Sequence, residues 1–283
     1  MRFGVNTLIW SISFDADLVP FEKLKEAGVD GLEVPIFAPA DFPTASFRRC
    51  LAEYGFAATA VSICPADGKP ASADAADRER AYEHWKAAIG VAGECGVECL
   101  AGPSCSPVGY LPGTRRTEEE FQRAVEFHQR LGELLDDARV DLAIEPINRF
   151  ETYFLNTAAD ARRLADAVDH PRVGVIVDTF HSNIEDKSTP AALRACGSRL
   201  RHVHTCENDR GTPGSGHVDW LEVLATLDEM GYDEWLTIES FNAAAPELAA
   251  ATAIWRDLAP TSDDIAVAGT RFLRELWAAR KSR

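Results

Sequence analysis

Four polar residues stand at the ends of four short apolar runs in the second half of the chain. Apolar runs of this length are typical of buried strands. Because a (β/α) barrel gathers its catalytic residues at the carboxyl ends of its strands, we predict that these side chains share one site. They are Glu145 after residues 140–144, Asp178 after 173–177, His204 after 200–203, and Glu239 after 236–238.

Three carboxylates and one imidazole form a hard, oxygen-rich ligand set. Such a set suits Mn²⁺, Mg²⁺ or Co²⁺ in roughly octahedral coordination with some positions left open, whereas thiolate sites favour zinc. A carbonyl and a neighbouring hydroxyl of a substrate fit the open positions. The metal would then act as a Lewis acid and lower the pKa of the carbon beside them.

Glu145 and Glu239 follow the fifth and the eighth apolar run, which lie far apart around a ring of eight strands. The two carboxylates are therefore expected to approach a central ligand from opposite sides. Stereochemical inversion needs this geometry, because one carboxylate removes a proton from one face of a carbon next to a carbonyl and the other returns a proton to the opposite face.

Three further polar residues follow these positions closely: Glu151, His181 and Arg210. We interpret them as substrate-binding groups rather than metal ligands. His181 is placed to donate to a carbonyl oxygen, Arg210 to hold a hydroxyl, and Glu151 to orient either of them. The alternative is that Arg210 and Glu151 are ordinary surface-loop residues.

The remaining histidines and Glu33 carry weaker predictions. Glu33, at the end of the second strand, is left open between a substrate contact at the barrel mouth and no such contact. His202 is expected to be structural and to face the helix layer. The same structural role is assigned to His84, His128 and His170, and none is assigned to His217.

Strand-like and helical stretches alternate about eight times, with no linker between them. This pattern predicts a single α/β domain over residues 1–283, a (β/α)8 barrel with a C-terminal helical extension from about residue 260, for which roughly 250 residues suffice. Thr117 and Glu120 form a candidate capping box. The predicted strands are 2–8, 31–34, 57–63, 98–101, 140–144, 173–178, 200–204 and 235–239, and the predicted helices are 18–27, 44–54, 75–95, one from Thr117, 158–168, 190–196, 220–230, 246–258 and 263–279.

Composition argues against several classes of protein. The net charge of −16, from 29 Lys and Arg against 45 Asp and Glu, would repel nucleic acid. The seven cysteines form no CxxC pair, which indicates free thiols and a reducing, cytoplasmic location. No signal peptide or membrane span is indicated. The glycines of GTPGSGH do not match a nucleotide-binding pattern.

Several blocks of the chain resemble the D-tagatose/D-allulose 3-epimerases within the xylose-isomerase-like barrels. The blocks are EPINRFE, DTFHSNIED, HVHTCENDRG and IESF, followed by AIWRDLAPTSDD. The resemblance implies that Glu145, Asp178, His204 and Glu239 bind a divalent metal, usually manganese, cobalt or magnesium. It also implies that the two glutamates act at C3 of a ketose through a cis-enediolate, and that Glu151, His181 and Arg210 contact O1, O2 or O3.

The resemblance further implies a free ketose substrate and a homodimer or homotetramer. Positions that depart from the family pattern are expected to line the end of the pocket that receives C4 to C6: Ser182, Cys64-Pro65, Cys105-Ser106 and Asn208-Asp209. Aldose–ketose isomerisation and an inosose-type dehydration of a cyclic polyol ketone stay open as alternatives, because both also begin with proton abstraction beside a carbonyl. A metal-dependent nuclease and a silent sugar-binding protein fit the residues less well.

Overall fold

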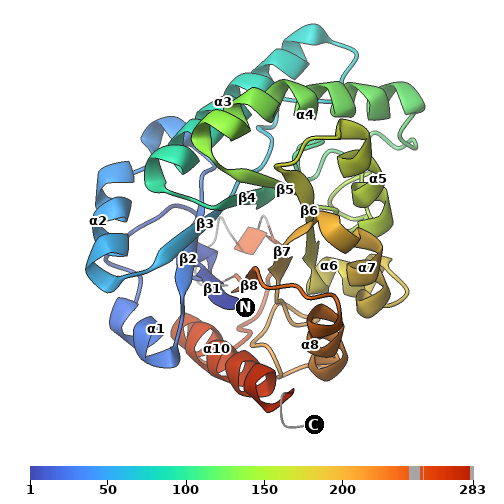
Figure 1. Cartoon of the computed structure of the whole chain (residues 1–283). Helices are drawn as coiled ribbons and strands as arrows, with labels where there is room; N and C mark the ends of the chain where they lie inside the picture. The colour runs from blue at the N-terminus through green and yellow to red at the C-terminus, as the bar shows by residue number, and fades with distance from the viewer. Residues whose placement is uncertain (242–248, 251, 281–283) are drawn as a thin grey trace.

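The computed structural model describes residues 1–241, 249–250 and 252–280. Eight parallel strands close into a barrel in chain order, with β8 pairing back to β1 (Figure 1). The strands are β1 Arg2–Asn6, β2 Gly31–Pro35, β3 Ala57–Val61, β4 Cys99–Gly102, β5 Asp141–Ile144, β6 Val173–Asp178, β7 Leu200–His204 and β8 Trp235–Ile238. The predicted (β/α)8 fold is thereby confirmed.

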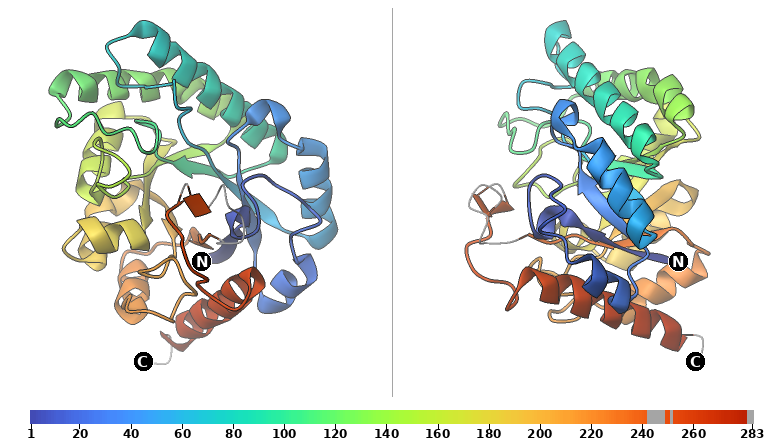
Figure 2. Two further views of the ribbon diagram at one scale, coloured as in Figure 1. Left: turned by 180° about the vertical axis from the view of Figure 1, so that it is seen from behind. Right: turned by 90° about the vertical axis from the view of Figure 1, so that its left-hand side faces the viewer.

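Helices form a ring around the strands (Figure 1). They are α1 Phe21–Ala27, α2 Thr44–Tyr54, α3 Ala75–Cys95, α4 Glu118–Ala138, α5 Ala158–Val168, α6 Thr179–Glu185, α7 Thr189–Cys196, α8 Trp220–Glu229 and α10 Ser262–Ala279, with short 3-10 turns at Thr7–Ile9, Pro39–Asp41 and Gly197–Arg199. The last helix, α10, packs beside α1 and also touches α8 and the first strand, which Figure 2 shows from behind and from the side. It therefore closes the ring between the first and the last βα unit.

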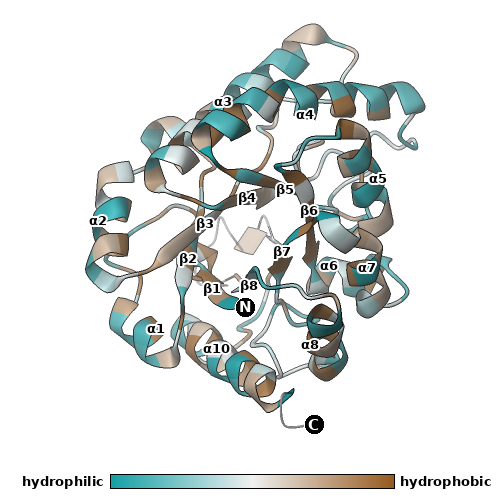
Figure 3. Cartoon of the chain, in the orientation of Figure 1, coloured by the Kyte–Doolittle hydropathy of each residue, from teal (hydrophilic) through white to brown (hydrophobic). Residues whose placement is uncertain are grey.

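The apolar core has an outer and an inner part. The larger cluster fills the space between strands and helices and includes Trp85, Leu100 and Leu131. A smaller cluster lies inside the barrel and includes Val61, Ala101 and Ile176. Figure 3 shows brown, apolar strands within helices that carry teal, polar surface. Side chains therefore fill the barrel interior, and chemistry is confined to its ends.

Several predicted boundaries differ from the observed ones near the carboxyl ends of the strands. Strand β1 ends at Asn6, because the Asn6 side chain accepts a hydrogen bond from the Leu8 amide and starts a 3-10 turn. Helix α6 was not predicted, since seven residues are too few to show a helical period. The predicted helix 246–258 lies partly outside the described residues; of the described ones, residues 249, 250 and 252 are helical and residues 254–258 are not.

No helix among the described residues combines the length and the apolar character that crossing a bilayer requires.

All seven cysteines are free and buried.

The predicted capping box of α4 is present. The Thr117 hydroxyl accepts from the Glu120 amide at 3.2 Å, and the Glu120 carboxylate accepts from the Thr117 amide at 2.7 Å. We expect Thr117→Ala to lower the free energy of unfolding by about 1 kcal/mol, because it leaves a helix N–H group without its partner. Urea denaturation measures this, with Thr114→Ala in the exposed preceding loop as control. Equal stability of the two variants would contradict the assignment.

Candidate active site

The four residues at the strand ends converge as predicted. One ligand atom from each of Glu145, Asp178, His204 and Glu239 lies within 4.8 Å of all the others, and all four residues are buried. His204 Nδ1 lies 3.8 Å from Glu145, 3.9 Å from Asp178 and 3.4 Å from Glu239. Four consecutive strands, β5 to β8, supply the group.

The donor set fits a divalent cation. His204 Nδ1 is buried and has no hydrogen-bond partner, although it faces three carboxylates. Its other ring nitrogen, Nε2, lies 2.7 Å from a Glu33 oxygen. A neutral imidazole protonated at Nε2 would present only a lone pair to the carboxylates, and four converging acceptors need a positive charge between them.

The pKa shifts of Glu145 and His204 also indicate that this group of carboxylates suits a cation. Burial raises the pKa of Glu145 well above its ordinary value, and the neighbouring Glu239 and Asp178 carboxylates add to the rise. Burial alone would lower the pKa of His204, but Glu239 and Glu33 outweigh it and hold that pKa well above the ordinary value. Both shifts favour the protonated form of the side chain. A metal ion bound at either side chain would therefore have to displace a proton.

Arg210 lies directly against the carboxylate group. Its Nη1 donates to Asp178 Oδ2 at 2.5 Å and to Glu239 Oε2 at 2.9 Å. The rings of Phe180 and Phe241 lie 4.2 and 5.0 Å from the guanidinium carbon. The backbone of Arg210 adopts the left-handed conformation, with φ of 67°. Strain of this kind in a residue other than glycine is typical of functional sites.

His181 forms a pair of hydrogen-bond donors with Arg210. Its Nδ1 accepts from the Asn148 amide at 3.2 Å, which leaves Nε2 to carry the proton. Burial lowers the pKa of His181 to about 3, so the ring is neutral. Arg210 Nη2 lies 3.1 Å from Nε2 and can only donate, so this contact is a hydrogen bond only when Nε2 accepts. With the hydrogen on Nε2, the two N–H groups face each other and need an oxygen acceptor that both can reach.

Glu151 joins the same cluster through a residue that sequence reasoning missed. The Asn148 side-chain amide donates to Glu151 Oε1 at 2.6 Å and also lies 3.0 Å from His181 Nδ1. Burial raises the pKa of Glu151. The three predicted substrate-binding residues are thus brought together beside the carboxylate group. The only sequence signal for Asn148 was its place three residues after Glu145.

A buried glutamate that sequence reasoning also missed supports the loop that carries Arg210. The Glu207 carboxylate accepts from the amides of Asn208, Gly214 and Val218 and from the Trp220 indole. Its own carbonyl accepts from the Arg210 amide at 3.0 Å. A Gly- and Pro-rich loop of this length forms few internal backbone bonds, and the carboxylate replaces them.

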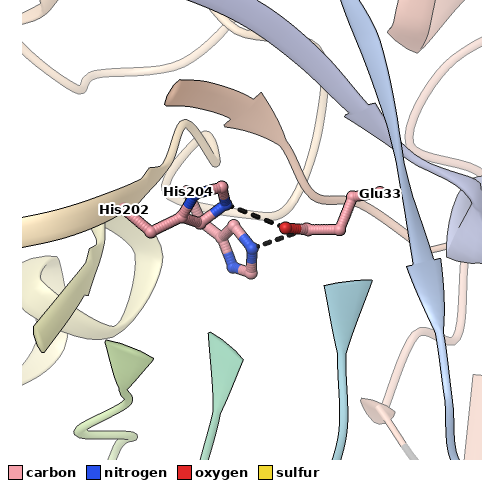
Figure 4. A group of neighbouring side chains, drawn as sticks. All are labelled: Glu33, His202 and His204. Carbon is pink, nitrogen blue, oxygen red and sulfur yellow. Dashed lines mark hydrogen bonds and ion pairs between the residues drawn. The ribbon is translucent and has the colours of Figure 1, made fainter. Parts of the chain in front are cut away.

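One prediction about the barrel interior was wrong, and one position that had been left open is now described. His202 does not face the helix layer: its Nε2 lies 2.8 Å from a Glu33 oxygen, beside His204 (Figure 4). The reason is that side chains two residues apart on a strand point to the same face. Glu33 is fully buried among these histidines rather than at the mouth. His128 is buried and bonded to Ser104, as a structural histidine should be, and His217 is exposed.

A cavity of about 1060 Å³ opens above the carboxylate group. Glu145, Glu239, Glu151, His181 and Arg210 lie among its lining residues, and apolar side chains form much of the remaining wall, including Phe37, Val108, Phe150 and Trp255. Of the positions expected to line its far end, only Asp209 does so. Ser182, Cys64 and Cys105 are buried outside it.

Comparisons with known proteins agree with this geometry. The family model described as xylose isomerase-like TIM barrel matches residues 21–276. A probable ketose 3-epimerase from Synechocystis sp. is 34% identical over 98% of this chain and 97% of its own length. The ketose 3-epimerase of Arthrobacter globiformis is 30% identical over 100% of this chain and 99% of its own.

A solved structure shares the whole fold. The D-allulose 3-epimerase from Methylomonas sp., crystallised in complex with D-allulose, superposes with a TM-score of 0.91 at 29% identity. The superposition covers 97% of this chain and 96% of that one.

The crowded carboxylates predict how metal binding depends on pH. Glu145 and His204 have raised pKa values in the folded protein, so their contribution to stability is present at low pH and is lost as pH rises through those values. A bound cation removes this loss. We therefore expect Mn²⁺ to raise the Tm of EDTA-treated protein more at about pH 8 than at about pH 5.

Thermal denaturation at both pH values checks this expectation. Asp178→Asn is the matched control, because it removes one candidate ligand charge and should shrink the gain at both pH values. A Tm gain that does not change with pH would show that the ion binds elsewhere.

Proposed function

We propose a reaction for this chain on the premise that it belongs to the xylose isomerase-like TIM barrel family and, within it, to the ketose 3-epimerases. The proposed reaction is inversion of C3 of a free ketose. It would use a divalent metal ion, with Mn²⁺ as the first candidate. One observation carries the proposal. Two buried glutamates, from the non-adjacent strand ends of β5 and β8, share one cavity and one candidate metal group.

Glu145, Asp178, His204 and Glu239 would hold the ion. When bound, a divalent ion supplies Lewis-acid stabilisation of negative charge on the oxygens beside the reacting carbon. Mn²⁺ and Co²⁺ accept a mixed set of carboxylates and one imidazole, and Mg²⁺ also fits the oxygen-rich part.

The two glutamates are proposed as the acid and base. Burial would raise the pKa of Glu239, but His204 and Arg210 outweigh it and lower that pKa, whereas the pKa of Glu145 is raised. Environments that push two carboxyl pKa values apart are typical of acid–base pairs. Glu239 is thus suited to take the C3 proton in one direction while Glu145 returns a proton to the other face. The roles exchange in the reverse reaction.

Glu151, His181 and Arg210 are proposed to hold the sugar. The donor pair of His181 and Arg210 suits a carbonyl or hydroxyl oxygen, and the Glu151 carboxylate suits a hydroxyl hydrogen. Among the described lining residues, the cationic side chains are Arg210 and Arg256, and both already contact carboxylates. An uncharged ketose is therefore favoured over a phosphorylated one.

Two broader properties belong to the same proposal. The family resemblance supports a homodimer or homotetramer. Light scattering during size-exclusion chromatography would measure the molar mass of the assembly. The seven buried free thiols support a reducing compartment such as the cytoplasm.

Isotope labelling tests the proposed reaction. Metal-loaded protein is incubated in D₂O separately with D-fructose, D-tagatose, D-allulose and L-ribulose, and NMR locates the deuterium. We expect label at C3 together with the C3 epimer, because a proton removed by one carboxylate exchanges before the other returns one. Label at C1 or an aldose product would indicate an isomerase, loss of water a dehydratase, and no exchange a binding protein.

Single substitutions separate the two glutamates from the rest of the cavity. Glu145→Gln and Glu239→Gln should each lower epimerisation by at least about 10²-fold, since each removes a positioned acid or base. Val108→Ala, in the apolar wall of the same cavity, should retain the reaction and serves as control. Turnover of each variant is followed by NMR. Full activity in either glutamine variant would remove that glutamate from the mechanism.

A further inference from the structure

The Glu33 carboxylate is enclosed inside the barrel below the candidate metal group. Glu33 is fully buried, as are His202 and His204, and Figure 4 shows both imidazoles directed at its two oxygens. His204 Nε2 lies 2.7 Å from Oε1, and His202 Nε2 lies 2.8 Å from Oε2. One carboxylate from β2 therefore meets two side chains of β7 across the barrel.

Two more donors complete the surroundings of the carboxylate. The Asn6 side-chain amide donates to Oε1 at 2.9 Å, and the Thr59 hydroxyl donates to Oε2 at 3.0 Å. Each oxygen is thus approached from two sides, by Asn6 and His204 at Oε1 and by Thr59 and His202 at Oε2. A buried carboxylate is stable when donors occupy its lone pairs in this way.

The orientation of Asn6 is itself fixed. Its Oδ1 accepts from the Leu8 amide at 2.9 Å, so Nδ2 must face Glu33. The same Nδ2 lies 3.5 Å from Glu239 Oε1. Asn6 therefore cannot turn its oxygen toward the carboxylate, and Oε1 is left as an acceptor for His204.

These contacts determine which nitrogen of His204 carries hydrogen. A carboxylate oxygen only accepts, so an imidazole nitrogen 2.7 Å away must be an N–H donor. In the neutral ring the other nitrogen, Nδ1, then bears the lone pair, and Nδ1 is the atom that faces Glu145, Asp178 and Glu239 without a hydrogen-bond partner. The contact with Glu33 therefore fixes the His204 tautomer that metal binding needs, with hydrogen on Nε2 and a lone pair on Nδ1.

We propose that Glu33 is a positioning residue that fixes the ring and tautomer of His204 so that Nδ1 is presented to a divalent metal ion, with Asn6, Thr59 and His202 holding Glu33 in place. The inference rests on the proposed metal-dependent function but concerns a residue outside the four ligands. Partners of metal-ligating histidines commonly change metal affinity about 10- to 100-fold when they are removed.

The test measures Mn²⁺ affinity of the folded, sugar-free protein. We expect Glu33→Ala to weaken Mn²⁺ binding about 10- to 100-fold, measured from the electron paramagnetic resonance signal of free Mn²⁺. Co²⁺ absorption should change as well, because the imidazole ligand is released. Unchanged Mn²⁺ affinity and an unchanged Co²⁺ spectrum in Glu33→Ala would overturn the proposal.

Two further variants separate positioning from simple packing. Thr59→Val removes one donor to Glu33 but leaves the contact between Glu33 and His204, so it should lower stability and weaken Mn²⁺ binding much less than Glu33→Ala does. Glu33→Gln should bind Mn²⁺ better than Glu33→Ala, since its oxygen still accepts from His204. Its amide nitrogen can face the rotatable Thr59 hydroxyl and His202 Nε2, because the His202 ring can carry its hydrogen on the unpartnered Nδ1. If Thr59→Val lost as much affinity as Glu33→Ala, the effect would be one of packing.

The tautomer can also be observed in the wild-type protein, which removes any dependence on a variant that fails to fold. In ¹⁵N spectra of Mg²⁺-loaded protein, His204 should carry its hydrogen on Nε2. Hydrogen on Nδ1 would overturn the inference. Failure of the wild-type protein to bind any divalent metal would instead refute the proposed function, so the two failures are distinguishable.

Discussion

The crowding of three carboxylates in one buried space is the constraint on which the site depends. Glu145, Asp178 and Glu239 are brought together because β5, β6 and β8 end at the same level of a closed barrel. Anions this close inside a protein are tolerated only when a cation, a proton or strong donors balance them. The contacts of Arg210, the raised pKa of Glu145 and the raised pKa of His204 are three responses to the same excess of negative charge.

The cavity has a polar end and an apolar end. Polar groups gather at its base, where Asn148 links Glu151 to His181 and where Glu207 supports the loop of Arg210. Apolar side chains such as Phe150 and Trp255, which are 71% and 75% exposed, form the wall toward solvent. For the proposed sugar, this arrangement would fix the reacting end firmly and place few polar contacts on the rest of the molecule.

Much of the site could be predicted from sequence because each candidate ligand lies at the end of a strand, and strand ends in a barrel meet at one face. The same reasoning could not find the supports. Glu33 and His202 lie 169 residues apart in the chain, and only closure of the barrel brings them into contact. Helix α6 is too short for a periodic signal, and Asn148 and Glu207 act through backbone groups whose positions no local pattern reveals. The error over His202 came from misapplying strand alternation, which puts residues 202 and 204 on one face.

The central claim is that Glu145, Asp178, Glu239 and Nδ1 of His204 together hold one divalent ion. Anomalous diffraction from a crystal of the Mn²⁺-loaded protein would test it most directly. The account predicts a single strong peak between these four groups, with Glu33 still bonded to His204 Nε2. A peak beside Glu33 and His202, or an ion bound without His204 Nδ1, would contradict it.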